Sequence, residues 1–148
     1  MLSGARFLPQ RAGRFAEGAE VNREELSRIT GAVVDAGMKV HSVLGPGLLE
    51  STYEACLAHE LRNRGFTVRT QVPLAVSYEG LELDLGYRVD VLVDEEVVVE
   101  LKAVSKLLPI HEAQLLSYLK LNNFRVGLLI NFHAVHLRDG IKRMVNRW

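Results

Sequence analysis

The chain has 148 residues, of which 48% are hydrophobic and 24% charged, and its 18 basic residues balance 18 acidic ones to give a formal net charge of zero. This composition is typical of a soluble globular protein, and the zero net charge excludes proteins that bind nucleic acid through an overall basic charge. No stretch has the roughly 18 consecutive apolar residues of a membrane span, and the single cysteine, Cys56, excludes an internal disulfide framework and favours a cytoplasmic location.

The chain is predicted to have two parts. Residues 1–21 contain glycine, proline and arginine without sustained periodicity, and we expect them to form a flexible leader to which we assign no function. Residues 22–148 are expected to form a single domain, because a chain of this length buries roughly 70% of its unfolded surface.

Two helices are predicted at the start of this domain. From Leu26 onward, apolar residues recur at helical spacing, and Glu24 and Glu25 suit the first turn. The sequence "GPG" at 45–47 ends this helix. The second helix runs through "LLESTYEACLAHELRNRG" and is expected to stop at Gly65.

After the second helix, the pattern changes to strands. "FTVRTQVPLAVSY" predicts a first strand, with Pro73 favouring a sheet edge or a bulge, and "EG" at 79–80 turns the chain into a second strand, "LELDLGYRVDVLV". A short acidic turn leads to the third, "VVVELKAV". A helix in "IHEAQLLSYLKLNN", a strand in "FRVGLLINF" and a last strand or short helix in "AVHLRDGIKRMV" follow. This order predicts an α/β fold with a mixed sheet flanked by helices.

Three charges, Asp90, Glu100 and Lys102, interrupt the apolar hairpin "DVLVDEEVVVELKAV". A charge buried there without a partner costs several kcal/mol. Glu100 and Lys102 share one face of their strand, because strand side chains alternate. We predict a three-residue turn at 94–96, which is a common loop length and places Asp90 opposite Glu100. The same register places Arg88 opposite Lys102. A two-residue turn at 95–96 would instead place Asp90 opposite Leu101.

Two explanations of these charges are open from spacing alone. Carboxylates directly opposite each other destabilise a sheet, and a divalent cation would offset this repulsion, because Mg²⁺ typically binds one or two carboxylates with waters and phosphate oxygens. Lys102 would then steady an attacking water or neutralise charge on a phosphate. The other explanation is a structural salt bridge from Asp90 or Glu100 to Lys102 or Arg88.

Two further segments carry polar residues with similar alternatives. "GLLESTYE" at 47–54 places Glu50 in the first turn of the second helix, on the same face as Glu54. Glu50 either complements the helix dipole or shares a cation or base with its neighbour. In "PIHEAQLLSYLK", Gln114 and Tyr118 share a helix face, as members of a polar stripe or of a site.

Several of these segments resemble a known family. "HSVLGPGLLESTYEACLAHELRNRGFTV", "YRVDVLVDEEVVVELKAV", "PIHEAQLLSYLKL" and "GLLINF" look like the bacterial GxxExxY proteins. That family is placed in the PD-(D/E)XK nuclease-like superfamily with many restriction enzymes and Holliday-junction resolvases. The resemblance runs from about Leu26 to Asn146 and implies a restriction-endonuclease-like core. Val89 stands where the motif name has proline.

The resemblance also implies a set of site residues. Asp90 matches the motif aspartate, and Glu100 and Lys102 match the (D/E)xK pair. Gln114 matches the glutamine of the following helix, and Glu50 matches the acidic residue of the first core helix. The resemblance implies that Glu50, Asp90 and Glu100 bind Mg²⁺ or Mn²⁺. It also implies hydrolysis of phosphodiester bonds, most simply in DNA, by a metal-activated water.

A non-catalytic module is the alternative function. Such a module would retain the nuclease-like core and bind nucleic acid or another protein, and the zero net charge favours it. The same neutral charge also suits a homodimer that pools local basic patches around nucleic acid. Nothing in the sequence identifies the interface of such a dimer.

Overall fold

The structure, a computed structural model, describes residues 22–147, and the leader predicted for residues 1–21 lies outside them. Its helices are α2, α3, α4 and the 3₁₀ helix η1, which span Arg23–Leu44, Glu50–Asn63, Pro109–Leu121 and Leu137–Gly140. Asn22 caps α2, because its side chain accepts a hydrogen bond from the Glu25 N–H at 2.8 Å. The predicted helices are confirmed. Among the described residues, no helix combines the length and the apolar character needed to cross a membrane.

The main sheet has five strands in the order β1-β4-β5-β6-β7. They span Val68–Pro73, Arg88–Val93, Val97–Lys102, Val126–Asn131 and Ile141–Val145. β5 and β6 run parallel and the other neighbouring pairs run antiparallel, so the sheet is mixed. β1 lies at an edge, as Pro73 predicted.

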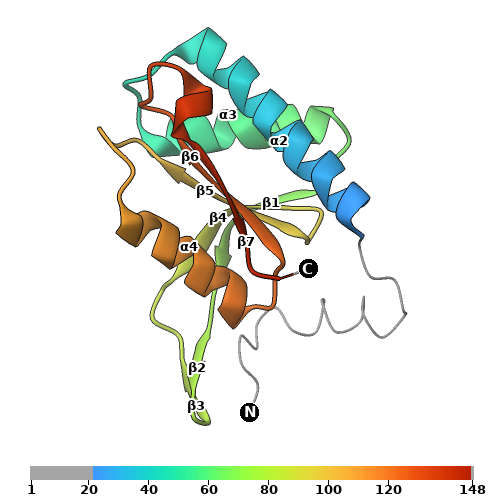
Figure 1. The fold of residues 1–148 in the computed structure, drawn as a ribbon, viewed down its shortest axis with the longest axis vertical. Helices are drawn as coiled ribbons and strands as arrows, with labels where there is room; N and C mark the ends of the chain where they lie inside the picture. The colour runs from blue at the N-terminus through green and yellow to red at the C-terminus, as the bar shows by residue number, and fades with distance from the viewer. Residues whose placement is uncertain (1–21, 148) are drawn as a thin grey trace.

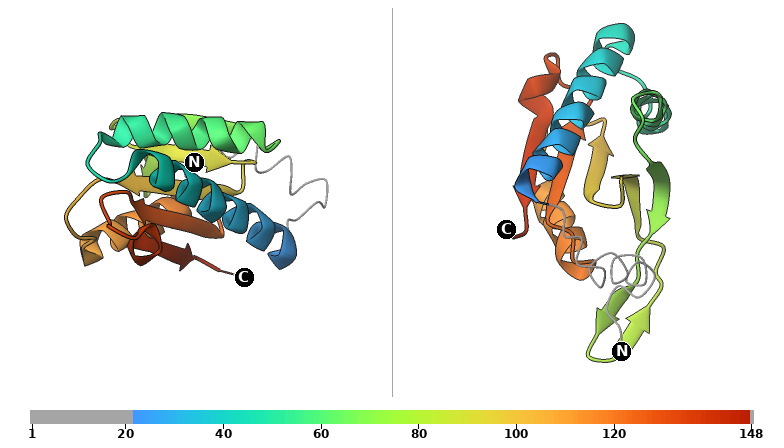
Figure 2. Two further views of the ribbon diagram at one scale, coloured as in Figure 1. Left: turned by 90° about the horizontal axis from the view of Figure 1, so that it is seen from above. Right: turned by 90° about the vertical axis from the view of Figure 1, so that its right-hand side faces the viewer.

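Helices cover both faces of this sheet (Figure 1). α2 and α3 pack on one face, and α4 packs on the other, as the view from above shows (Figure 2). Each face has its own apolar core, and β-branched residues of β4 and β5 contribute to both. This architecture confirms the predicted restriction-endonuclease-like α/β fold.

The structure corrects the prediction of two continuous strands at 66–78 and 81–93. Each is divided, and the separated pieces, β2 (Val76–Tyr78) and β3 (Leu81–Leu83), pair only with each other. Together with the residues as far as position 85 they form a projecting hairpin, here called the arm (residues 76–85; Figure 1). Pro73 is still paired with Arg88, and the Leu74 N–H donates to the Tyr87 carbonyl at 2.8 Å. The physical reason for the division is that Gly86 then turns the chain with a φ of 82°.

The alternation of side chains is interrupted at one level of β1 and β4. Val68 lies in the core under α2 and α3, but Val72 lies in the core under α4, although residues four apart in a strand share a face. In β4, Val91 lies in the core under α2 and α3 and Val89 lies in the core under α4, although residues two apart also share a face. Between Val68 and Val72, Gln71 has a φ of 51°, in the left-handed region. Both strands therefore change face at this level.

Gly127 of β6 allows α4 to pack directly on the sheet. A methyl group there would lie 3.0 Å from Leu115 Cδ1, 3.1 Å from Leu119 Cδ2 and 3.2 Å from the Val98 carbonyl oxygen. Because the backbone oxygen cannot shift freely, we expect Gly127→Ala to lower the free energy of unfolding by about 1–3 kcal/mol. Urea denaturation measures this change.

Gly31→Ala is the matched control. Gly31 is exposed within α2, and nothing lies within 4 Å of an added Cβ. The same substitution should there raise the free energy of unfolding by about 0.5–1 kcal/mol, because alanine favours the helix. Equal effects at the two glycines would contradict the packing explanation.

Candidate active site

The predicted register of the β4–β5 hairpin is confirmed for the three pairs of its ladder, but no ladder pair joins Arg88 to Lys102, as the same register had predicted. The turn has three residues, 94–96, and the ladder that follows ends where Val91 pairs with Val99. Asp90 and Glu100 come directly after that last pair, on opposite strands. Two acidic residues therefore meet at the open end of the hairpin.

Each of these two carboxylates accepts a hydrogen bond from the backbone of the opposite strand. The Asp90 N–H donates to Glu100 Oε1 at 2.9 Å, and the Leu101 N–H donates to Asp90 Oδ2 at 2.8 Å. These bonds take the place of ladder bonds beyond Val91. Glu100 is only 5% exposed, so its carboxylate is held inside the protein.

Burial and mutual repulsion change the acidity of the pair. Burial, and next the neighbouring Asp90 carboxylate, raise the pKa of Glu100 from 4.5 to about 8. Burial also raises the pKa of Asp90, although the bonds from the Leu101 N–H and the Gln71 amide oppose this shift. At neutral pH the pair therefore tends to keep a proton unless a cation compensates its charge.

Gln71 and Glu54 join this pair, and of the two only Glu54 was considered from the sequence, as the neighbour with which Glu50 could share a cation or base. Gln71 Nε2 donates to Glu54 Oε1 at 2.6 Å and to Asp90 Oδ1 at 3.3 Å. Burial raises the pKa of Glu54, and the Asp90 carboxylate adds to that shift. The spacing of Glu54 one turn after Glu50 was the available signal. No signal in the sequence pointed to Gln71, because its bonds to Glu54 and Asp90 depend on a backbone conformation that glutamine rarely adopts.

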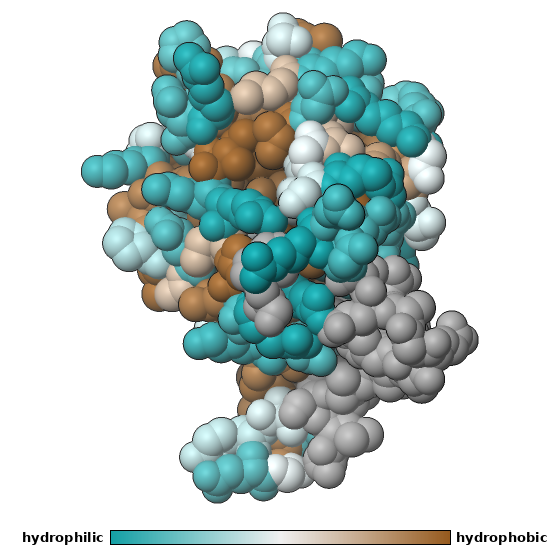
Figure 3. Space-filling view, turned by 45° about the vertical axis from the view of Figure 1, so that its right-hand side comes forward, coloured by the Kyte–Doolittle hydropathy of each residue, from teal (hydrophilic) through white to brown (hydrophobic). Residues whose placement is uncertain are grey.

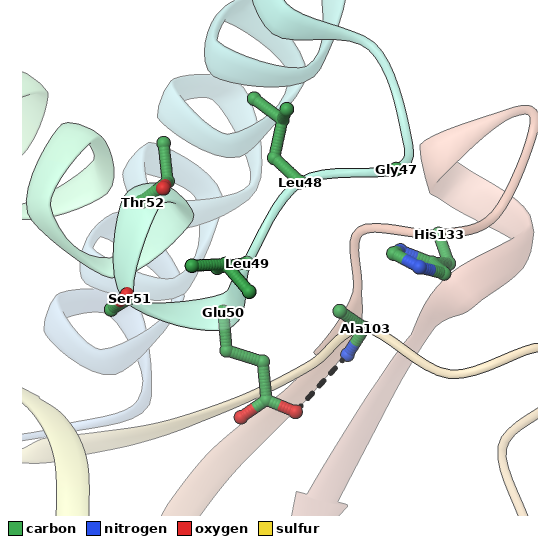
Figure 4. Close-up of a pocket in the computed structure, with 8 residues that line it drawn as sticks. All are labelled: Gly47, Leu48, Leu49, Glu50, Ser51, Thr52, Ala103 and His133. Atoms are coloured by element: carbon green, nitrogen blue, oxygen red, sulfur yellow. Dashed lines mark hydrogen bonds between the residues drawn. The ribbon is translucent and has the colours of Figure 1, made fainter.

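Glu50 brings a third predicted carboxylate to the site. It is the first residue of α3, and its Oε2 accepts a hydrogen bond from the Ala103 N–H at 3.3 Å (Figure 4). Its charge contributes to the raised pKa of both Asp90 and Glu100. A pocket of about 780 Å³ opens beside it, between the start of α3 and the segments of Ala103 and His133 (Figure 4).

Tyr53 fixes the loop that leads into α3. Its hydroxyl donates to the Gly45 carbonyl at 2.6 Å and accepts from the Leu48 N–H at 3.0 Å. Its ring stacks on Phe132 with centroids 4.5 Å apart, and the side chain is fully buried. Tyr53 therefore positions Glu50 indirectly and is not placed to contact a substrate.

Lys102 lies at the end of β5 and is half-buried. Its charge lowers the pKa of both Asp90 and Glu100, against the larger effect of burial. Within residues 22–147, neither carboxylate forms a salt bridge with Lys102 or Arg88. The structural salt bridge considered from the sequence is therefore not observed.

Asn131 anchors the chain just beyond Lys102. Its Oδ1 accepts from the Val104 N–H at 3.1 Å, and its Nδ2 donates to the Val104 carbonyl at 2.8 Å. The Phe132 N–H also donates to the Lys102 carbonyl at 2.9 Å. Because Asn131 is buried, these bonds fix the backbone that carries Lys102.

Gln114 is connected to the carboxylates through Tyr118. Its Nε2 donates to the Tyr118 hydroxyl at 3.0 Å, and its described hydrogen bonds include none to Asp90 or Glu100. Burial, and next the charge of Glu100, raise the pKa of Tyr118. The predicted site thus has a close pair, Asp90 and Glu100, around which the other predicted residues lie at greater distance.

The donor set suits a hard divalent cation, although it is incomplete as it stands. Within the described part of the chain, no three histidine, cysteine, aspartate or glutamate side chains are arranged to hold a metal ion. Mg²⁺, however, is commonly held by one or two carboxylates, with waters and phosphate oxygens completing its shell. Asp90 and Glu100 supply such a pair, and an adjacent cation would relieve their repulsion.

Comparison with known proteins assigns most of the chain to one family. A family model described as the PD-(D/E)XK nuclease superfamily matches residues 27–144, which is more than three quarters of the 148 residues. Searches of curated proteins and of solved structures gave no significant match.

The raised pKa of Glu100 predicts a pH-dependent stability in metal-free protein. Because the pKa is near 4.5 in the unfolded chain and about 8 in the folded one, protonation favours folding. The free energy of unfolding should therefore fall as pH rises from about 5 to 8, by on the order of a few kcal/mol. Urea denaturation in EDTA across this range measures it.

Glu100→Gln should remove most of this fall, because the amide stays neutral and its oxygen can still accept from the Asp90 N–H. At about pH 8 the variant should then be more stable than the wild type. Glu24→Gln, at an exposed position of α2, should keep the wild-type pH dependence. Parallel curves for Glu100→Gln and wild type would disprove the role given to Glu100.

Proposed function

This chain belongs to the PD-(D/E)XK nuclease superfamily, and we propose from that membership that it is a metal-dependent nuclease that hydrolyses phosphodiester bonds in DNA. One observation carries the proposal. The carboxylates of Asp90 and Glu100 each accept a backbone hydrogen bond across the end of the hairpin, and Glu50 and Lys102 lie beside them. Within the superfamily we place it among the GxxExxY proteins, on the motif formed by Gly47, Glu50 and Tyr53.

Asp90 and Glu100 would hold Mg²⁺ or Mn²⁺, with Glu50 as the third carboxylate. When bound, such an ion lowers the pKa of a coordinated water and polarises a phosphate oxygen. The two backbone bonds keep Asp90 and Glu100 in place before any ion binds, which reduces the cost of ordering the ligands. Glu50 is exposed and lies at the edge of the pocket, where nucleic acid would enter.

Lys102 and Gln114 would act beside this pair. The ammonium of Lys102 would neutralise charge that develops on the phosphate or hold the attacking water, and Asn131 supports the backbone from which it projects. Gln114 would orient the site through its bond to Tyr118. We also propose DNA as the substrate and the cytoplasm as the location, the latter because the only cysteine is free.

Calorimetric titration with Mn²⁺, paired with a cleavage assay on duplex, branched and single-stranded DNA, tests this function. We expect the wild type to bind Mn²⁺ saturably and to cleave at least one substrate only with metal. The Asp90→Asn, Glu100→Gln double variant should lose both properties. Lys102→Ala should still bind Mn²⁺ but cleave roughly 100-fold more slowly, because it removes charge stabilisation and not a ligand.

Glu24→Gln is the control, because it removes an exposed carboxylate outside the site and should leave binding and cleavage unchanged. A wild type that binds no Mn²⁺, even with DNA present, would contradict the proposal. The result would instead favour the non-catalytic module. RNA in the same panel distinguishes the two nucleic acids.

A further inference from the structure

A histidine to which the proposed function gives no role lies in the pocket beside Glu50. This pocket of about 780 Å³, here called the α3 pocket, is lined by residues 47–52, Ala103 and His133. Figure 4 shows the His133 ring across the pocket from Leu49 and Glu50. An imidazole and a predicted site residue therefore line opposite sides of one pocket.

The two ring nitrogens of His133 differ in burial. Nδ1 is buried, and among residues 22–147 it has no hydrogen-bond partner. Nε2 also has no partner within the described chain, but it is not buried, so it is open to the pocket that the residue lines. Because a buried N–H without a partner is costly, the neutral ring is favoured with its proton on Nε2. His133 then offers an N–H donor to a ligand in the pocket.

The backbone that carries His133 is fixed before any ligand binds. The His133 N–H donates to Asn131 Oδ1 at 3.1 Å, and the preceding Phe132 N–H donates to the Lys102 carbonyl at 2.9 Å. Asn131 is buried and also holds the backbone just after Lys102. The fold therefore keeps His133 and Lys102 in a fixed relation, which a pair of groups on one substrate requires.

The start of α3 adds backbone donors to the same pocket. Leu49, the residue before the helix, makes no side-chain cap bond. Within the described chain, the N–H groups of Glu50 and Ser51 have no acceptor, and both residues line the pocket. Uncapped N–H groups and the helix dipole favour an anion at this end of a helix. The α3 pocket therefore has donors from α3 on one side and from His133 on the other.

Charge distinguishes the α3 pocket from a second cavity beside the candidate site. That cavity is a groove of about 640 Å³ between the base of the arm and α4, and Gln114 lines it. The arm that forms its other wall has three acidic residues and no lysine or arginine, and Figure 3 shows its hydrophilic side chains at the bottom of the view. Of the described residues that line the α3 pocket, only Glu50 is acidic, and a cation beside it would offset its charge. Because like charges repel, a phosphate suits the α3 pocket and not the groove.

We propose that His133 binds a phosphate of the substrate strand next to the scissile one, with the N–H groups of α3 as further donors. The inference rests on the proposed function, which places the scissile phosphate at Asp90 and Glu100. One nucleoside joins consecutive phosphates of a strand, so a phosphate held in the α3 pocket limits where the scissile one can lie. His133 is then a substrate-binding residue, and its loss affects KM more than kcat.

Titration with inorganic phosphate at fixed pH, followed by NMR, tests the pocket without DNA. Phosphate should shift the ring signals of His133 and the backbone N–H signal of Ser51, with saturation in the millimolar range. His133→Ala should weaken this binding roughly 10-fold, because it removes a hydrogen bond to a charged group. His133→Gln keeps an N–H donor and should recover part of the loss. His136→Ala is the control, because His136 is exposed and lies outside the pocket.

Neutral methylphosphonate groups test the contact in DNA. In a substrate that the wild type cleaves, a single methylphosphonate would replace the phosphate on one side of the scissile bond or on the other. At one of these positions the KM of the wild type should rise roughly 10-fold, with kcat changed by less than about threefold. His133→Ala should be nearly insensitive to that replacement, because its contact with the phosphate is already lost. The other position is the internal control.

The inference would be overturned if about 50 mM phosphate left the His133 signals unchanged, or if wild type and His133→Ala bound phosphate equally. Equal losses by wild type and His133→Ala at both methylphosphonate positions would also contradict it. Circular dichroism melts show whether each variant is folded, and His133→Gln keeps the test open if His133→Ala is not. Phosphate binding by a protein that cleaves no DNA would refute the proposed function but retain His133 as a phosphate ligand.

Discussion

The site depends on two hydrogen bonds between β4 and β5, in which the Asp90 N–H donates to the Glu100 carboxylate and the Leu101 N–H donates to the Asp90 carboxylate. In an ordinary antiparallel ladder the backbone N–H groups donate to backbone carbonyls. Here the N–H groups of Asp90 and Leu101 donate to carboxylates instead. A buried N–H without a partner is costly. The two carboxylates are the acceptors of these N–H groups, so the fold must hold both acids in place to satisfy them. Stability and the candidate site are therefore coupled.

This arrangement has an electrostatic cost that the backbone bonds offset only in part. Burial and the nearby Asp90 carboxylate together raise the pKa of Glu100, even though it accepts the Asp90 N–H. A proton and a divalent cation relieve the same excess of negative charge, and they would compete for the same carboxylate oxygens. The left-handed backbone conformation of Gln71 adds a separate conformational cost of roughly 1–2 kcal/mol. Its side-chain bonds to Glu54 and Asp90 compensate for it.

Local patterns predicted the features that depend on neighbouring residues in the chain. The helices from Arg23 and from Glu50, and the pairing that sets Asp90 against Glu100, follow from periodicity and turn length. The division of the two long strands was missed, because a single glycine such as Gly86 does not show from sequence whether the chain turns there, which tertiary packing decides. Residue spacing also could not place Gln114, whose link to the carboxylates runs through a second side chain.

The parts of the site differ in how firmly the fold holds them, and this difference has a chemical consequence. Glu100 is buried and bonded to backbone, and Asn131 fixes the backbone just after Lys102. Glu50 is exposed, and its bond to the Ala103 N–H, at 3.3 Å, is longer than the two bonds of the central pair. A carboxylate held this loosely can leave its backbone partner at small cost. The buried pair would then fix where a cation binds, while Glu50, at the mouth of the pocket, would adjust to the cation and the phosphate together.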